Sequence, residues 1–355
     1  MSTIIDRCRA NEFVLIAEIG VNYYDIAQKL NISLMEAAKY MVLAAKNAGI
    51  HAVKFQTYKA ETLASKYSPS YWDLSEEPTT SQYELFKKFD TFGESEYQEL
   101  SAFCQQIGIE FCSTPFDFTS ADYLEPMMGV YKISSSDLTN IPFIAYMAKK
   151  RKPILLSIGA SNREEIDAAV ACIRTYNDKD LVLLHCVLEY PTPYDHANLA
   201  KIQTLHAAYP EAHIGYSDHT KPDIECDVIK TAYLLGATVV EKHFTVDKTL
   251  KGNDHYHAMD PHDAKRILAA IERIDRLKGN AELAALPSEA KARENARRSI
   301  VAAVEIPAGT RIEESMLTFK RPGQGISPSD LSRVIGKTTS RQIERDVVLT
   351  WEMIQ

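Results

Sequence analysis

Eight short runs of β-branched and apolar residues recur along the first 245 residues of the chain, and segments with helical periodicity separate them. Segments 34–48, 164–175 and 223–235 repeat their apolar residues at steps of three and four, the spacing of one helix face. Strands that alternate with helices are typical of a parallel sheet. Eight such units predict a closed (β/α)8 barrel of the α/β class rather than an open doubly wound sheet, since no GxGxxG follows any run. The predicted strands are residues 13–20, 51–57, 110–115, 130–136, 152–159, 181–187, 213–219 and 237–244.

Each of these runs begins apolar and ends in polar residues. The active site of a barrel enzyme lies at the carboxyl ends of its strands, so we expect these residues to form one polar ring. The alternative is that these polar residues only begin loops. That explanation would suffice for one strand end, but it is a poor one for all eight. The ring would hold Glu18, Lys54, Gln56, Ser113, Thr114, Lys132, Ser134, Ser135, Ser136, Ser157, His185, Ser217, Asp218, His219, Glu241, Lys242 and His243.

Two histidines occupy equivalent positions on neighbouring predicted strands. His219 ends the seventh run inside SDH, and His243 ends the eighth inside EKHF. Two imidazoles near the barrel mouth can share one divalent cation and leave coordination positions open for a substrate. A single histidine is more often a hydrogen-bonded polar residue, but the pair predicts a catalytic metal site.

Three lysines, Lys54, Lys132 and Lys242, also stand at strand ends. A lysine inside a barrel is costly to bury unless an anion pairs with it, and a phosphorylated, carboxylated substrate would supply such partners. The neighbouring serine and threonine hydroxyls suit phosphate oxygens. The alternative is a set of salt bridges to nearby carboxylates, which suits Lys242 best.

Two loops interrupt the regular order of strands and helices. Residues 58–92 form a long, aromatic-bearing insertion after the second run, which is either a lid or substrate loop or a surface excursion. The stretch DKTLKGNDHYHAMD (247–260) follows the eighth run and must overhang the site. Its Asp254, His255 and His257 are candidates for further metal ligands or for sugar-binding groups.

The character of the sequence changes beyond Leu277. An Ala-rich, charged segment there predicts an exposed helical linker, and short elements with dense turn signals follow it. We expect a barrel domain at residues 1–280, a linker at 281–296 and a small, mostly β domain at 297–355. A module of about 60 residues is marginally stable alone and should pack on something.

The charge and cysteine content limit the partners and the compartment. The net charge of −8 with no basic run makes nucleic acid and anionic membranes poor partners. No stretch approaches the roughly 18 apolar residues of a membrane span, and the N-terminus is too polar for a signal peptide. Six cysteines without a CxxC pair favour buried thiols in a reducing compartment. We therefore expect a cytoplasmic protein.

Seven motifs spread over nearly the whole chain resemble those of the sialic acid synthase family. The resemblance implies a (β/α)8 barrel followed by an antifreeze-like (SAF) domain. It also implies a domain-swapped homodimer in which each small domain covers the active site of its partner. The motifs are IAEIGVN (16–22), VKFQTY (53–58), STPFD (113–117), YKISSSD (131–137), SDHT (217–220), VVEKHFT (239–245) and RPGQGIS (321–327).

The implied reaction condenses phosphoenolpyruvate with an N-acylated amino-sugar aldehyde, such as N-acetylmannosamine, to a nonulosonic acid. By this resemblance His219 and His243 would bind a divalent metal, Mn²⁺ or Mg²⁺. The partner's Arg321 would reach the acyl group of the sugar, and Asp137 would deprotonate the water that adds to C2. The sugar would contact Glu18, Gln56, Tyr190 and Asp254. Phosphoenolpyruvate would be held by Lys54, Thr114, Lys132, Ser135, Ser157 and Ser217, and Glu18, Asp137, Lys54 and Lys132 would form the catalytic group.

Four departures from the family pattern stand out; nearly all would line the sugar side of the implied site, and the Val187–Leu188 replacement removes one implied phosphoenolpyruvate contact. GVNYYD stands where the family usually reads GVNHNG, and Asp137 stands where a glutamate is typical. Val187 and Leu188 replace a polar Thr-Asn pair, and GNDHYHAMD replaces a PGPD-type loop. The resemblance therefore implies the class of reaction but leaves the sugar open.

Two other functions remain as alternatives. The first is a Schiff-base aldolase that uses free pyruvate, with Lys132 or Lys54 as the nucleophile. The second is a non-catalytic ice- or sugar-binding protein built around the small domain. Residues 297–355 lack the regular threonine array of an ice-binding face, and simple binding would not require the full ring of strand-end groups.

Overall fold

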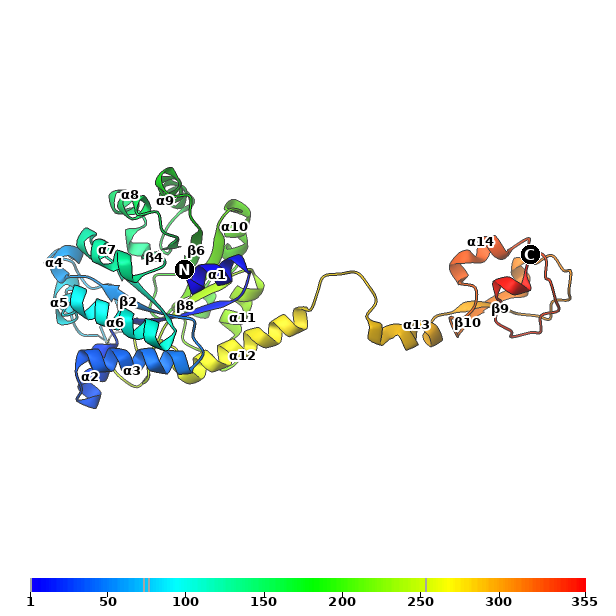
Figure 1. Cartoon of the computed structure of the whole chain (residues 1–355), viewed down its shortest axis with the longest axis horizontal. Helices are drawn as coiled ribbons and strands as arrows, with labels where there is room; N and C mark the ends of the chain where they lie inside the picture. The colour runs from blue at the N-terminus through cyan, green and yellow to red at the C-terminus, as the bar shows by residue number, and fades with distance from the viewer. Residues whose placement is uncertain (1, 73, 76, 253) are drawn as a thin grey trace. The chain divides into compact units, whose positions relative to one another are not determined.

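The computed structural model describes residues 2–72, 74–75, 77–252 and 254–355. The chain forms two compact units, residues 1–278 and residues 279–355 (Figure 1). Among the described residues, no helix is long and apolar enough to cross a membrane.

The first unit is built on eight parallel strands in the order β3-β2-β1-β8-β7-β6-β5-β4. The two ends of this order, β3 and β4, are also in contact, so the sheet curves into a barrel. This confirms the (β/α)8 prediction. The strands are β1 (Val14–Gly20), β2 (Ala52–Thr57), β3 (Glu110–Pro115), β4 (Tyr131–Ile133), β5 (Ile154–Ser157), β6 (Leu181–Cys186), β7 (His213–Asp218) and β8 (Val239–His243).

The helices of this unit surround the barrel (Figure 1), and local signals set their ends. Before the third helix, the Ser33 side chain accepts from the Glu36 amide while the Glu36 carboxylate returns to the Ser33 amide, a reciprocal cap. The sixth helix ends at Gly108, whose φ of +72° suits glycine. The helices are α2 (Tyr23–Leu30), α3 (Leu34–Asn47), α4 (Ala60–Leu63), α5 (Gln82–Lys88), α6 (Glu94–Ile107), α7 (Phe118–Leu124), α8 (Ile141–Lys149), α9 (Arg163–Tyr176), α10 (Lys201–Ala208), α11 (Asp227–Leu234) and α12 (Pro261–Lys278), with 3-10 helices η1 (Glu125–Met127), η2 (Ser135–Asp137) and η3 (Tyr194–His196).

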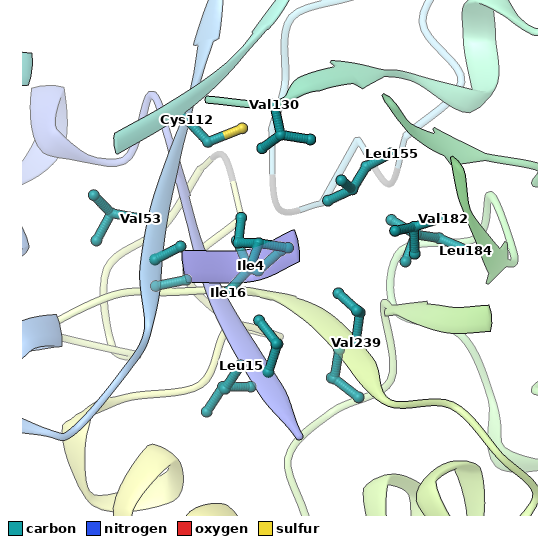
Figure 2. Packing of buried hydrophobic residues seen from close by; sticks show 14 of the residues in the cluster. Ile4, Leu15, Ile16, Val53, Cys112, Val130, Leu155, Val182, Leu184 and Val239 are labelled. Carbon is teal, nitrogen blue, oxygen red and sulfur yellow. The ribbon is translucent and has the colours of Figure 1, made fainter. Parts of the chain in front are cut away.

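The core fills the barrel and one of its ends. The strands are buried on both faces, which explains their continuous apolar runs. The N-terminal helix α1 (Thr3–Arg9) contributes Ile4 to the same core, where it lies among strand residues such as Leu15 (Figure 2). The Ile4 amide and the Ser2 hydroxyl both donate to Glu110 at the start of β3. This helix therefore closes the amino end of the barrel, and the polar strand ends lie at the other.

The second unit has a core of its own, made of residues such as Ile300, Ile306, Ile326 and Leu349. Its sheet is one antiparallel pair, and isolated bridges join the remaining segments. This agrees with a small module rich in turns. Its elements are η4 (Pro287–Glu289), α13 (Ala290–Ala296), β9 (Ser299–Ala302), η5 (Glu314–Met316), β10 (Leu317–Lys320), η6 (Pro328–Asp330), α14 (Leu331–Val334) and η7 (Trp351–Met353).

Candidate active site

The carboxyl ends of the strands enclose a polar cavity of about 60 Å³. Every residue predicted to bind the metal or phosphoenolpyruvate lines it, as do three of the predicted sugar contacts. The strand-end ring is therefore a real feature of the fold, because eight separate segments converge on one cavity. Its lining is Glu18, Lys54, Gln56, Thr114, Phe116, Lys132, Ser134, Ser135, Ser157, Cys186, Leu188, Tyr190, Ser217, His219, Glu241 and His243.

Lys242 is the exception among the strand-end lysines. Successive side chains of a strand point to opposite faces, so Glu241 and His243 line the cavity and Lys242 turns away from it. The Lys242 ammonium lies 2.6 Å from a carboxylate oxygen of Asp218 and donates to the carbonyl of Thr220, where all three residues are buried. The prediction that Lys242 faces an anion site is wrong, and the salt-bridge alternative holds for it.

The two remaining lysines are paired with buried carboxylates. Lys54 Nζ lies 2.5 Å from Glu18 Oε2 and 3.8 Å from Glu241 Oε1, and Lys132 Nζ lies 3.4 Å from the same Glu241 oxygen. Burial alone would raise the pKa of Glu241, but the two ammonium groups outweigh it and lower this pKa to about 2. The cavity thus holds two lysine ammonium groups whose positions are maintained by carboxylates.

Hydroxyl groups surround these charges. The Ser157 hydroxyl is buried and has no hydrogen-bond partner among the described residues. Thr114 accepts a hydrogen bond from Lys54 at 3.0 Å, and Ser217 donates to Glu241 at 3.3 Å. An unpaired buried hydroxyl costs about 1–3 kcal/mol. The Ser157 hydroxyl is therefore a donor available to a ligand oxygen.

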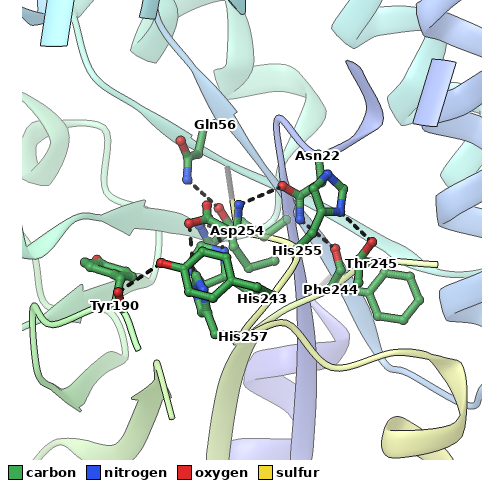
Figure 3. A network of polar contacts seen from close by, with 12 residues as sticks. Asn22, Gln56, Tyr190, His243, Phe244, Thr245, Asp254, His255 and His257 are labelled. Carbon is green, nitrogen blue, oxygen red and sulfur yellow. Dashed lines mark hydrogen bonds and ion pairs between the residues drawn. The ribbon is translucent and has the colours of Figure 1, made fainter. Parts of the chain in front are cut away.

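The imidazoles of His219, His243 and His257 lie around the ring of Tyr190 beside this cavity. Figure 3 shows His243 and His257 together with the carboxylate of Asp254. The ring centroids of His219 and His243 are 5.4 Å apart, and those of His243 and His257 are 5.0 Å apart. Asp254 lies between the last two, 3.2 Å from His243 Nδ1 and 3.7 Å from His257 Nε2. The ligand atoms of His243, Asp254 and His257 all lie within 4.8 Å of one another. Nitrogen and carboxylate donors at such spacings fit a divalent cation.

The sequence does not distinguish the two loop histidines, His255 and His257, but their hydrogen bonds differ in the structure. His255 uses both ring nitrogens, at 2.7 Å from the Thr245 hydroxyl and 3.1 Å from a carboxylate oxygen of Asp25. Both nitrogens of His257 are buried and unpartnered in the described part of the chain, and burial lowers its pKa well below the usual range. Burial would lower the pKa of His243 too, but the carboxylate of Asp254 raises it. His255 thus anchors the loop, and His257 faces the site.

A second cavity of about 150 Å³ adjoins the histidines. Residues of the 58–92 insertion supply much of its wall, including Tyr58, Trp72, Phe86 and Phe89. The described residues that line it include no lysine or arginine. The insertion thus lines a cavity beside the histidines and is more than a surface excursion. The full lining is Val21, Gln56, Tyr58, Tyr71, Trp72, Glu77, Leu85, Phe86, Phe89, Tyr190, His243, Asp254 and Tyr256.

Models of two known protein families match the chain. The NeuB family model matches residues 41–283, and the SAF domain model matches residues 297–355. The chain belongs to the NeuB family. The resemblance inferred from the seven motifs is confirmed.

Known proteins similar to this NeuB chain include synthases of several nonulosonic acids. The chain is 36% identical to the N,N′-diacetyllegionaminic acid synthase of Legionella pneumophila, covering 96% of this chain and 94% of that protein. It is 30% identical to the N-acetylneuraminate-9-phosphate synthase of Mus musculus, covering 96% and 92%. The crystal structure of an N-acetylneuraminic acid synthetase from Leptospira borgpetersenii matches with a TM-score of 0.66 at 30% identity, covering 79% of this chain and 90% of that one.

Two residues predicted for the NeuB site lie outside both cavities. Asp137 belongs to η2, where Asn140 donates to it at 3.1 Å, and burial raises its pKa. Arg321 is exposed in the second unit. Their roles stay predictions. The structure gives Glu241 and His257, which the sequence named only as a member of the ring and as one of several loop candidates, a definite place beside the lysines and beside His243.

Proposed function

We propose that the chain condenses phosphoenolpyruvate with an N-acyl amino-sugar aldehyde, giving a nonulosonic acid and phosphate. The observation that carries this proposal is the junction of two unlike cavities, which share Gln56, Tyr190 and His243 in their linings. One cavity offers buried cations and hydroxyls, and the other offers aromatic walls. An anionic substrate in the first and a sugar in the second would meet beside the histidines.

In the proposed reaction, Lys54 and Lys132 bind the phosphate and carboxylate of phosphoenolpyruvate. The hydroxyl of Ser157 donates a hydrogen bond to an oxygen of one of these two anionic groups. C3 of phosphoenolpyruvate forms a bond to the aldehyde carbon, whose oxygen takes up a proton. Water adds to C2 and loses a proton, and phosphate leaves as the ketone forms. Asp137 is the base predicted from the sequence. Glu241 lines the cavity, but the two lysines lower its pKa to about 2, so it is a weak base and serves to position them.

His219, His243, Asp254 and His257 would hold the divalent cation of this reaction. The Nδ1 of His219 donates to the carbonyl of Val187 at 2.6 Å, which leaves its Nε2 available to a ligand. A cation bound there would polarise the carbonyl oxygen of the aldehyde. The unpartnered nitrogens of His257 support a cation at this point rather than a set of internal hydrogen bonds.

The lining of the aromatic cavity indicates which sugar acceptor it would bind. Apolar walls suit acylamino and deoxy groups, and a phosphorylated sugar would require cations that the described lining does not supply. We therefore favour an unphosphorylated diacetamido-trideoxyhexose over N-acetylmannosamine 6-phosphate. The similarity to a synthase named for N,N′-diacetyllegionaminic acid points the same way.

The small domain completes the proposal at the level of the assembly. As the family resemblance implies, we propose a swapped homodimer in which residues 297–355 cover the partner's barrel and Arg321 reaches the acyl group of the sugar. Closure of this kind would exclude bulk water from the condensation. We place the reaction in the cytoplasm, which suits the six free cysteines of the chain.

The pKa of Lys54 argues against the Schiff-base alternative. Burial would lower the pKa of this lysine, but Glu18 and Glu241 outweigh burial and raise it. A nucleophilic lysine needs a lowered pKa to be neutral near pH 7. Borohydride trapping with pyruvate would still reveal an imine directly.

The decisive experiment is phosphate release from phosphoenolpyruvate with a panel of acceptors. We expect release with a diacetamido-trideoxyhexose and a divalent metal, weaker release with N-acetylmannosamine, and none with its 6-phosphate. A chelator should abolish the reaction. Borohydride inactivation with pyruvate, or no release with any of the three sugars, would refute the proposed function.

A further inference from the structure

The loop after β8 brings a third imidazole to the two that end the strands. The Met259 amide donates to the carbonyl of His243 at 2.7 Å, and the Thr245 amide donates to the carbonyl of Met259 at 3.0 Å. The loop therefore returns beside the end of β8 and is tied to it by backbone hydrogen bonds. His255 ties it further through Thr245 and Asp25. The position of His257 is thus determined by the fold and not by a mobile excursion.

His257 is buried to 0% exposure, and neither of its ring nitrogens has a hydrogen-bond partner among the described residues. Leaving such a group unpaired is unfavourable, because its hydrogen bonds to water are lost without replacement. His255, two residues earlier, is equally buried but satisfies both nitrogens. The difference indicates that His257 is arranged for a ligand that binds at this point.

The spacing of the neighbouring donors matches that of a coordinated ion. Asp254 oxygens lie 3.2 Å from His243 Nδ1 and 3.7 Å from His257 Nε2 (Figure 3). Donors placed at ~2.1 Å around a tetrahedral ion lie ~3.4 Å from one another. Only small side-chain movements would let all three donors reach one ion.

We propose that His257 is a third imidazole ligand of this cation, acting with His243 and Asp254, and that it selects a first-row transition metal over Mg²⁺. Imidazole nitrogen suits the later first-row ions such as Co²⁺ and Zn²⁺, whereas Mg²⁺ prefers oxygen ligands and retains water. The sequence predicts ligation by His219 and His243 and leaves Asp254, His255 and His257 as candidates for further ligands. The two strand-end imidazoles alone would discriminate less between these ions. The inference rests on the proposed function only in taking this cation as the one that serves the condensation.

Metal binding to the full-length, metal-free protein tests the inference without any sugar. Co²⁺ would be titrated by its visible absorption, and Zn²⁺, Mn²⁺ and Mg²⁺ by calorimetry, for the wild type, His257→Ala and His257→Gln. We expect both variants to bind Co²⁺ and Zn²⁺ at least about tenfold more weakly and to change the Co²⁺ spectrum. Their Mg²⁺ affinity should be unchanged.

His262→Ala serves as the matched control, because this histidine lies five residues further along and is exposed. It should bind every metal as the wild type does. Unchanged Co²⁺ affinity and spectrum in a folded His257→Gln protein, checked by circular dichroism, would overturn the inference, as would an equal loss for Mg²⁺. Failure of phosphate release with all sugars would refute the proposed function alone, because these titrations do not depend on turnover.

Discussion

The buried lysines at the carboxyl end of the barrel are paired with buried carboxylates. Lys54 and Lys132 share the carboxylate of Glu241 as a partner, and Glu18 pairs with Lys54 as well. Removing one member of this buried set leaves the charge of another without a partner. A single substitution here therefore lowers the stability of the fold strongly. The predictions at this scale concern the lysine, the glutamate and the metal-binding histidines.

Lys132→Ala should weaken phosphoenolpyruvate binding by about 1.5–3 kcal/mol, because a charge-assisted contact is lost. That corresponds to a rise of roughly 10- to 150-fold in the dissociation constant. Calorimetric titration of the variant with phosphoenolpyruvate measures it. If saturation is unchanged, the anion pocket lies elsewhere in the chain.

His219→Ala and His243→Ala should each lose metal affinity and activity while remaining folded, since each removes a donor from the mouth and not from the core. Metal content after gel filtration and phosphate release at low added metal measure the two losses. Full activity of either variant under those conditions would remove that histidine from the metal site.

Glu241→Gln should alter the dependence of stability on pH. The folded-state pKa of Glu241 is lowered to about 2 from an ordinary value of 4.5. Its contribution, on the order of 3 kcal/mol, is therefore fully present above pH 4.5 and is lost as the pH falls toward 2. Denaturant unfolding of the barrel between about pH 5 and about pH 3 should show a steeper loss for the wild type than for the variant. Parallel curves would contradict this assignment.

Among the larger elements, the 58–92 insertion has the clearest consequence for function. It carries the short helices α4 and α5 and supplies aromatic residues to the second cavity. Trp72 is held in this wall by its indole nitrogen, which donates to the carbonyls of Glu77 and Thr79. An element that shapes the acceptor cavity should change acceptor binding and leave the anion pocket alone.

Trp72→Ala should raise the KM for the sugar acceptor by roughly 5- to 150-fold, since about 1–3 kcal/mol of apolar contact is removed. The KM for phosphoenolpyruvate should stay within about twofold. Tyr67→Ala is the matched control, because this tyrosine of the same insertion is 94% exposed and lies outside the cavity lining. Equal effects of the two substitutions would mean that the insertion acts only through its general stability.

At the scale of the whole molecule, the two units are separately packed, each with its own core. Arg321 lies in the second unit, in a turn-rich loop far along the chain from every barrel strand. If the dimer is swapped as proposed, each active site is built from two chains. Removing residues 279–355 should then leave a barrel that binds metal and phosphoenolpyruvate but does not condense the substrates.

Co-expression of Arg321→Ala and His243→Ala chains tests this arrangement. In a swapped heterodimer, one site combines an intact barrel with an intact Arg321, so partial activity should return although each variant alone is inactive. The other site carries both lesions and stays inactive. Heterodimers that form without any recovered activity would show that the small domain serves its own barrel.

Much of the architecture was predictable because it depends on local patterns. All eight strands lie where apolar runs end in polar residues, since a barrel strand must be buried along its length and meets the site at its carboxyl end. The same pattern identified His219, His243, Lys54 and Lys132 as neighbours before any contact was known. What the sequence determined by itself is thus the fold and the end of the barrel at which the polar groups gather.

The tertiary structure decided which of those groups face one another. Lys242 turns away from the cavity to Asp218 because the side chains of a strand alternate, whereas Glu241 faces the two lysines. His255 and His257 lie in one loop that returns beside β8. The path of this loop turns His255 toward Thr245 and His257 toward the site. Such pairings depend on strand register and on contacts between residues distant in sequence, and no local pattern specifies either.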